Sequence, residues 1–281
     1  GDVYKRQVRI QRWGVGGNMN WKRTKTLFIL VFLLVNVCLI FVYQDKVNKS
    51  KISDAEHDNA VNFERENIKL PKSMPDVSHV KMQLVTARSK DFKEEAEDNS
   101  KAKVSNHGHT LSKEMDERVD VKVDPISHLK PYIDDKIYKG NEYQYHETSD
   151  GQIKYEQTYR GFPIMNNNRA ELTFEVKGDS TKSYEQSTME DILPSKGTNN
   201  EPKKVIRARE ALEALYYNQY LKHGEEVESI RLGYYTVVKE TNIQVLQANW
   251  EIKVKDKNGV HTYYVEAVSY THLTLPTSDL V

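Results

Sequence analysis

"NEYQYHETSDGQIKYEQTYRGFPI", residues 141–164, has the clearest structural pattern in this chain. Apolar and polar residues alternate in its two runs, and that period of two is typical of a β-strand with one buried face. The runs meet at Asp150-Gly151, a dipeptide that favours the tight turn of a β-hairpin. We therefore expect an antiparallel hairpin here, and the neighbouring segments indicate what packs against it.

A short predicted helix precedes this hairpin, and a further strand follows it. Residues 124–140 begin with Asp124, a favoured helix cap, have proline at the first helical position and end at a glycine. Residues 169–178 alternate again and should extend the sheet. The predicted buried face of that strand comprises Leu172, Phe174 and Val176.

The same order of elements returns in the C-terminal part of the chain. Residues 201–224 predict an amphipathic helix that ends at Gly224. Its apolar face comprises Val205, Ala208, Leu212 and Leu215. The strands that should follow are residues 229–240, 245–256 and 260–268, the last two joined by a hairpin turn at Asn258-Gly259. The sequence thus predicts an α+β fold of two modules, each a helix with an antiparallel sheet, over residues 71–190 and 191–268.

Three segments before residue 124 have weaker patterns. Residues 45–70 have loose helical spacing and are followed by Pro71, which predicts a stalk helix. Residues 78–89 alternate like a half-buried strand, with Val80, Met82 and Leu84 on one face. Residues 90–118 are charged and poor in large apolar side chains, so we expect a solvated helix and a mobile loop.

Composition restricts the classes of function. The 281 residues are 29% charged and 38% hydrophobic with a formal net charge of zero, so the charge balance does not indicate a nucleic-acid partner. The single cysteine, Cys38, excludes a disulfide framework and a thiolate metal site within this chain. Seventeen tyrosines favour strands, where aromatic side chains pack well.

An apolar run, "TLFILVFLLVNVCLIFVYQ", occupies residues 26–44. A helix of this length spans about 30 Å, the thickness of the hydrocarbon core of a membrane. No small-x-small cleavage site follows it, and Val37 before Cys38 argues against a lipoprotein signal. We therefore expect one uncleaved transmembrane helix. The basic segment 19–25 should stay in the cytoplasm, which places the bulk of the chain outside the cell.

Neither end of the chain fits this architecture. "GDVYKRQ" and "SYTHLTLPT" are similar to translated sequencing-adapter DNA. We interpret residues 1–18 and 269–281 as non-native read-through and Met19 as the start.

One polar side chain, Asn36, lies in the middle of the apolar run. It is either a tolerated amide or the donor of an interhelical hydrogen bond. Helical spacing puts four apolar side chains on the same face as this amide, and we expect that face to contact a partner helix. These residues are Ile29, Phe32, Leu33 and Ile40.

The sequence gives little indication of catalysis or of a cofactor. It has no G-x-S-x-G, H-E-x-x-H or G-x-x-x-x-G-K motif. His107 and His109 could offer imidazoles, but the stretch offers no third metal ligand. The neighbouring carboxylates Asp134-Asp135 and Glu94-Glu95 point to different sides of a helix and suit solvent. We expect a protein that is not an enzyme and binds neither a cofactor nor a metal.

Several motifs resemble known protein modules. "YEQTYRGFPI" is similar to a strand and turn of PepSY modules, and "IRLGYY" and "LQANWEIKV" resemble the later strands of the same modules. The positions that carry this resemblance are Gly161, Pro163, Gly233, Tyr234 and Trp250. Independently of it, we expect Gly161 and Pro163 to form a strand-end turn, and the aromatic residues to lie in the core.

From residue 19 to residue 268 the chain resembles the YycI (WalI) family. The resemblance implies a membrane-anchored regulator that acts with YycH on WalK (YycG), a sensor histidine kinase of a two-component system for cell wall metabolism. It implies no catalytic residues. A PepSY-type binding module or peptidase inhibitor outside the cell remains the alternative.

Overall fold

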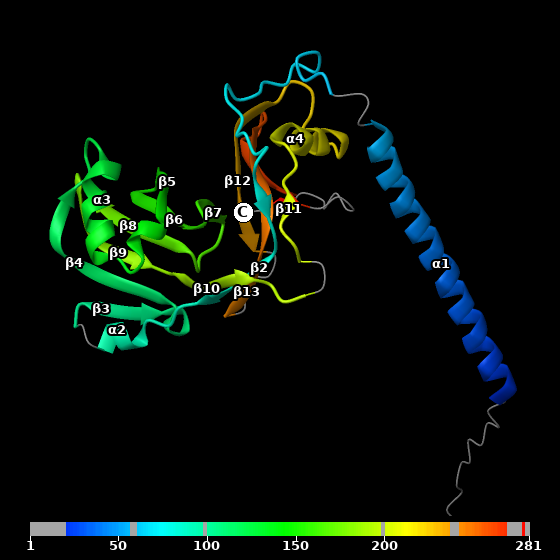
Figure 1. The fold of residues 1–281 in the computed structure, drawn as a ribbon, viewed down its shortest axis with the longest axis horizontal. Coiled ribbons are helices and arrows are strands. Elements are labelled where there is room, and N and C mark those ends of the chain that lie inside the picture. Colours follow the sequence, from blue (N-terminus) through cyan, green and yellow to red (C-terminus); the bar gives the residue numbers. More distant parts are fainter. Residues whose placement is uncertain are drawn as a thin grey trace, which may run out of the picture. The chain divides into compact units, whose positions relative to one another are not determined.

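The computed structural model describes residues 21–56, 61–97, 100–197, 200–236, 242–268 and 277–278. The chain divides into two compact units, Gly1–Asn59 and Ala60–Val281 (Figure 1). The segments that we interpret as read-through lie outside the described residues, except Thr277–Ser278. The mixed α+β class is confirmed: strands dominate the second unit, and the described part of the first unit is a single helix with an apolar segment.

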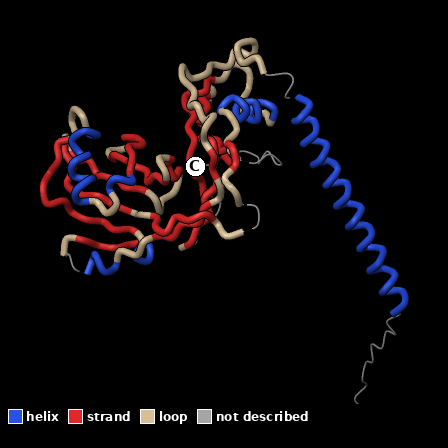
Figure 2. The backbone as a smooth tube through the Cα atoms, viewed as in Figure 1, coloured by secondary structure: helices blue, strands red, loops and turns tan. Residues whose placement is uncertain are grey.

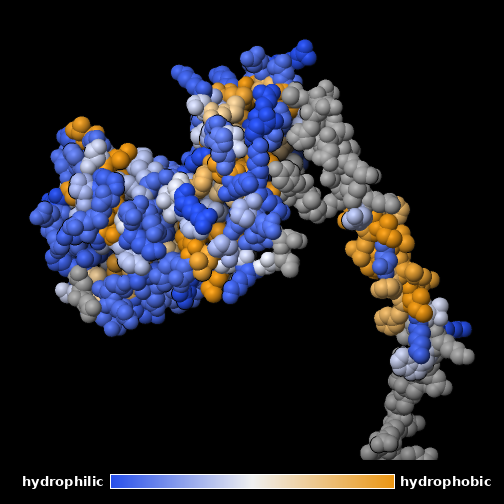
Figure 3. All heavy atoms as spheres, viewed as in Figure 1, coloured by the Kyte–Doolittle hydropathy of each residue, from blue (hydrophilic) through white to orange (hydrophobic). Residues whose placement is uncertain are grey.

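The first unit contains helix α1, Trp21–Glu56, which is 36 residues long. Lys25–Tyr43 is long and apolar enough to cross a membrane, and Figure 3 shows a largely hydrophobic surface along this segment of the helix. The predicted stalk helix is wrong for residues 61–70, which form turns, irregular chain and one isolated β-bridge at Lys69. Val61, Phe63 and Ile68 do not form one face of a helix but lie buried in the core of the second unit.

The strands of the second unit fall into two groups, each with its own helix and hydrophobic core. The α3 sheet comprises β3 (Ala102–Ser105), β4 (Thr110–Asp120), β5 (Tyr143–Ser149), β6 (Gln152–Tyr159), β8 (Glu171–Lys177) and β9 (Ser180–Gln186). The α4 sheet comprises β2 (Val85–Ser89), β7 (Phe162–Met165), β10 (Met189–Pro194), β12 (Glu226–Thr236), β13 (Ile243–Lys255) and β14 (Val260–Glu266). Figure 2 shows both groups mainly as strands, with few helices.

The two sheets are joined through one short strand, β7. It pairs antiparallel with β6 and parallel with β12, and the strand order runs β10-β2-β13-β12-β7-β6-β8-β9-β4-β3. In addition, β14 pairs with β13 and β5 pairs with β6. This arrangement differs from the module boundary that we expected at residue 190, since β2 and β7 precede that residue and yet pair with strands of the C-terminal half.

The remaining elements are short, and two of their strands, β1 and β11, pair as a separate two-stranded sheet. They are α2 (Lys93–Glu97), β1 (Lys81–Met82), β11 (Lys203–Lys204), β15 (Thr277–Ser278) and the 3-10 helices η1 (Asn106–Gly108) and η2 (Gly140–Glu142). Strand β15 pairs antiparallel with Tyr263 and Tyr264 of β14.

The hairpin predicted at Asp150-Gly151 is confirmed. Strands β5 and β6 pair antiparallel, and both turn residues have positive φ, 51° and 71°. That combination is the type I′ geometry, which matches the right-handed twist of the two strands.

The second predicted hairpin, between β13 and β14, is also present, but Asp256 shapes its four-residue turn. The Asp256 carboxylate accepts hydrogen bonds from the backbone N–H groups of Asn258 and Gly259.

Helix α3, Pro125–Lys136, covers the α3 sheet and follows the predicted helix closely. The Asp124 carboxylate accepts a hydrogen bond from the backbone N–H of Ser127 at 3.1 Å, which satisfies one free donor at the helix start. Leu129 and Ile133 are fully buried on the face toward the sheet.

Helix α4, Ala208–Tyr217, is shorter than predicted at both ends. Leu212 and Leu215 are fully buried, as the amphipathic pattern predicts. The helix starts late because the backbone N–H groups of Val205 and Ile206 donate to Val80 and Ala267. It stops before Gly224 because Gln219 takes a positive φ of 63°, which a helix does not permit.

Two predictions in the N-terminal part were wrong. Residues 90–118 contain strands β3 and β4 rather than a mobile loop, and β4 pairs with both β3 and β9. Leu84 is 41% exposed, although it was predicted to share a buried face with Met82. The strand pattern breaks at this point, and β2 resumes with Val85 and Ala87 as its buried apolar residues.

Candidate functional site

The predicted intramembrane face lies on helix α1. Its apolar residues are all exposed on the isolated helix, and Asn36 is half-buried among them. Asn36 Nδ2 donates to the backbone carbonyl of Phe32 at 2.7 Å. An amide has two N–H donors and an acceptor oxygen, so this bond uses a part of its capacity. The remaining N–H and the oxygen can still bond to a partner helix.

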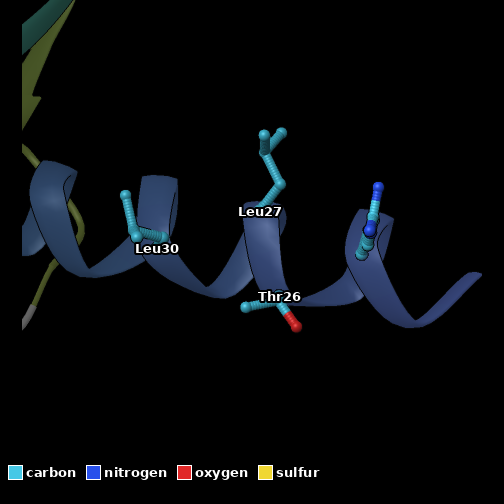
Figure 4. Close-up of a pocket in the computed structure, with 4 residues that line it drawn as sticks. Thr26, Leu27 and Leu30 are labelled. Carbon is cyan, nitrogen blue, oxygen red and sulfur yellow. The ribbon is translucent and has the colours of Figure 1, made fainter.

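A shallow hollow lies nearer the start of the same helix. Arg23, Thr26, Leu27 and Leu30 line it, and Figure 4 shows Leu27 and Leu30 projecting from one side of the helix and Thr26 from another. All four residues belong to α1, so the hollow is a surface of a single helix. It does not enclose a ligand.

The structure brings together two of the motifs that resemble PepSY modules. Gly161 makes the turn between β6 and β7 with a φ of 81°, and Pro163 follows it in β7. Parallel pairing of β7 with β12 then sets Pro163 against Gly233. A Cβ on Gly233 would lie 2.5 Å from the Pro163 carbonyl oxygen, so the close approach of these strands requires glycine.

The aromatic residues of these motifs lie in the core. Trp250 is fully buried, and its indole N–H donates to the Ile206 carbonyl at 3.0 Å. Tyr234 is buried and packs edge-to-face with Tyr159, with the ring centroids 5.7 Å apart. These contacts give both residues a structural role in the α4 sheet.

Sequence reasoning missed a group of ionic residues between the two sheets, which we call the Arg231 cluster. It comprises Arg231 of β12, Glu251 of β13, Tyr264 of β14, Glu156 of β6 and His146 of β5. The Arg231 guanidinium binds both carboxylates. It donates to Glu156 through Nη1 and Nη2, and to Glu251 through Nε at 2.6 Å and Nη2 at 3.0 Å.

Burial makes the charges of this cluster depend on one another. The Glu156 and Glu251 side chains are 8% and 4% exposed. Burial opposes ionisation of Glu251, but hydrogen bonds from Arg231 and Tyr264 hold its pKa below the usual value. Burial likewise opposes the charge on Arg231, yet the two carboxylates raise its pKa. Removing one partner would therefore leave an uncompensated charge in a poorly solvated position.

The other candidate residues are dispersed over the second unit. His109 Nδ1 donates to the Lys90 carbonyl at 2.8 Å, whereas His107 lies in η1. Asp134 and Asp135 pair with the neighbouring Lys130 and Lys136 in exposed positions. Among the described residues there is no group of three or more side chains that could hold a metal ion.

The match to a protein-family model decides the family. The model described as YycI protein matches residues 46–268, most of the chain. This chain belongs to the YycI family. YycI proteins are a regulatory family, and membership suggests a role in the YycG/WalK system. Together with the apolar helix α1, this family assignment suits a single-pass membrane anchor.

Other comparisons add little. A search of curated proteins gives no match. Among solved structures, the crystal structure of an uncharacterized protein from Eubacterium rectale ATCC 33656 is similar, with a TM-score of 0.41 and 10% sequence identity. The alignment covers 75% of this chain and 86% of that chain. This similarity is too low to indicate a shared function.

Proposed function

We propose that this protein is a membrane-anchored accessory regulator of the sensor histidine kinase WalK (YycG), and that it acts together with YycH. The observation that carries the proposal is the YycI family match over residues 46–268, which begins directly after Lys25–Tyr43, the part of α1 that is long and apolar enough to cross a membrane. The proposed partners recognise both parts of the chain, helix α1 and the folded second unit. The protein itself performs no catalysis.

We further propose that the N-terminus lies in the cytoplasm and the second unit outside the cell. Lys22, Arg23 and Lys25 precede the span in a short segment, and such basic segments are retained on the cytoplasmic side. A reporter that is active only outside the cell should work when fused after Val268. Activity of a cytoplasm-specific reporter at that position would overturn this orientation.

Within the membrane, the proposed contact is the face of α1 around Asn36. Lipid chains give little hydrophobic drive for helix association, so close packing and a few polar contacts must supply it. The Asn36 amide, one N–H of which donates to the Phe32 carbonyl, can offer its other N–H and its oxygen for such a polar contact.

The second candidate function is a PepSY-type module that binds a peptide or inhibits a peptidase. The repeated order of a helix followed by antiparallel strands, α3 with β5, β6, β8 and β9 and α4 with β12 to β14, favours a PepSY-like architecture. A module of this kind could serve either function, because fold alone does not determine activity.

Copurification separates the two candidates. The full-length chain, purified in mild detergent from cells that contain WalK, YycH and extracytoplasmic peptidases, should retain WalK and YycH. An unrelated single-pass protein with the same affinity tag serves as the control. Retention of a peptidase without the kinase would favour the alternative and contradict the regulatory proposal.

A further inference from the structure

One carboxylate oxygen in the Arg231 cluster lies between a permanent cation and a titratable group. Glu156 Oε2 accepts a hydrogen bond from Arg231 Nη1, and the same oxygen lies 3.6 Å from His146 Nδ1. The 3.6 Å separation is longer than a hydrogen bond, so in this state Glu156 is bonded to Arg231 and not to His146.

The two possible partners of Glu156 belong to different sheets. His146 lies on β5, beside Glu156 in the α3 sheet, whereas Arg231 lies on β12 of the α4 sheet. The Glu156–Arg231 ion pair therefore connects the two sheets, and a Glu156–His146 pair would remain within one of them. Backbone pairing between β6 and β7 is short, at two residue pairs, so side-chain contacts contribute to this connection.

Both ring nitrogens of His146 face carboxylates. Nδ1 lies 3.6 Å from Glu156, and Nε2 lies 3.8 Å from Glu147 Oε2. A neutral imidazole has one N–H and can donate to one of them, with its bare nitrogen turned toward the other carboxylate. The imidazolium has two N–H groups and can donate to both. Once the ring gains a proton, its two N–H groups therefore match the two carboxylates that face it.

Charges on the packed strands act on this ring or on its partner Glu147. Arg231 of β12 and Glu251 of β13 act on the ring, while Lys154 of β6, which pairs with Glu147 at 3.5 Å, and Lys253 of β13 act on Glu147. Burial lowers the pKa of His146 from its ordinary value of 6.5, and Arg231 acts in the same direction, while the three glutamates oppose them. The ring is therefore neutral at pH 7, and acidification protonates it against the cost of burial.

We propose that protonation of His146 draws Glu156 away from Arg231 and so weakens the connection between the two sheets in acidic surroundings. The ring takes one proton from solvent, Nδ1–H donates to Glu156 Oε2, and the Nη1 bond of Arg231 to that oxygen lengthens. Arg231 keeps its bonds to Glu251, so the guanidinium remains paired. If the second unit lies outside the cell, as proposed above, this connection between the two sheets responds to external pH.

The effect of pH on stability has a definite sign. Because the pKa of His146 is lower in the folded protein than in the unfolded chain, the unfolded chain binds more protons as the pH falls. The contribution of the neutral ring to stability is complete above the ordinary value of 6.5 and is lost as the pH decreases below it.

Hydrogen exchange on the full-length chain in detergent micelles tests the proposal. After correction for the intrinsic rate, amides of β6, β7 and the middle of β12 should exchange about tenfold faster at a pH near 5.5 than near 7.5, while α3 changes little. His146→Gln should remove this difference. His261→Gln, a change of an exposed histidine that lies 3.3 Å from Asp256, should retain it.

Two outcomes overturn the proposal: no local change in the unaltered chain, or the same change in His146→Gln. A second measurement needs no variant that might misfold. With labelled histidine and arginine, the Arg231 side-chain N–H resonances should shift with the midpoint of the His146 ring. Arg231 resonances that stay fixed while His146 titrates contradict the exchange of partners. Neither experiment involves the kinase, so both outcomes are independent of the proposed regulatory function.

Discussion

The carbonyl oxygen of Pro163 lies 2.5 Å from the point that a Cβ on Gly233 would occupy. The same point lies 2.8 Å from Met165 Sδ, so β7 closes off the space above Gly233. The sheets of the second unit are joined at this strand, because β7 pairs with β12 on one side and with β6 on the other. Gly233 thus permits the contact that makes one folded unit of two sheets.

Gly233→Ala should therefore destabilise the protein. The neighbouring atom is a backbone oxygen, which cannot move without displacing β7, and overpacking of this kind costs about 1–3 kcal/mol. Thermal or denaturant unfolding of the full-length chain in detergent measures the loss. Gly197→Ala is the matched control, since nothing lies within 4 Å of its added Cβ. Equal stabilities of the two variants would refute the requirement for glycine at position 233.

Arg231→Met should destabilise the protein more than the loss of any exposed ion pair would. It leaves Glu156 and Glu251 without their cation in a buried position, and loss of one partner from such a pair costs about 3–5 kcal/mol. Lys122→Met is the control, because Lys122 and Asp179 form a pair with exposed side chains and should contribute less than about 1 kcal/mol. The unfolding free energies of both variants test this. A small loss for Arg231→Met would show that solvent reaches the cluster.

Alkaline unfolding should follow the buried and half-buried tyrosines. Burial raises the pKa of Tyr132, Tyr155 and Tyr234 to about 12, above the ordinary value of 10. Since the unfolded chain loses these protons first, stability is complete below pH 10 and declines as the pH rises toward 12. Tyrosinate absorbance and circular dichroism, recorded together, should show a late group of tyrosines that ionises with unfolding. Complete ionisation before unfolding would contradict their burial.

The strands that alternate in sequence were predictable, whereas β4 was not. β4 has Leu111 and Met115 as buried apolar residues, four positions apart, and a register irregularity follows between Glu114 and Val119. Leu111 and Met115 lie on one face of the strand, but Lys113 stands between them, so apolar and polar residues do not alternate along β4. Backbone pairing with β3 and β9 holds the strand in the sheet. Charged residues along such a strand therefore suggested a solvated segment.

Of the candidate functional residues, the helical face around Asn36 was predictable from the sequence, whereas the Arg231 cluster was not. The helical face around Asn36 follows from spacing alone, because residues three and four apart meet on a helix. The Arg231 cluster depends on which strands become neighbours, and Glu156 and Arg231 are 75 positions apart. A sequence pattern indicates on which face of its strand a charged side chain lies, but it does not indicate which residue that side chain pairs with. The charged residues within otherwise apolar strands were the available sign of this cluster.

Asn36→Leu should weaken, but not abolish, binding of the membrane span to the kinase. An interhelical hydrogen bond is worth about 1–2 kcal/mol at most, and part of the amide already bonds to Phe32. Association of labelled helices in bilayers measures the change. Replacing Val31 or Leu34 by alanine, on the other side of the helix, should matter less. If an unrelated membrane helix in place of Leu27–Tyr43 leaves complex formation and kinase output unchanged, the contact must lie in the second unit.

The most direct test of the regulatory account is the autophosphorylation rate of WalK in proteoliposomes that contain YycH, with and without the full-length chain. The account predicts that addition of the chain changes this rate, because a partner that prefers one of two kinase states shifts their populations. An unrelated single-pass protein at the same density should have no effect. An identical rate with and without the chain, in vesicles where the three proteins copurify, would contradict regulation of the kinase by this protein.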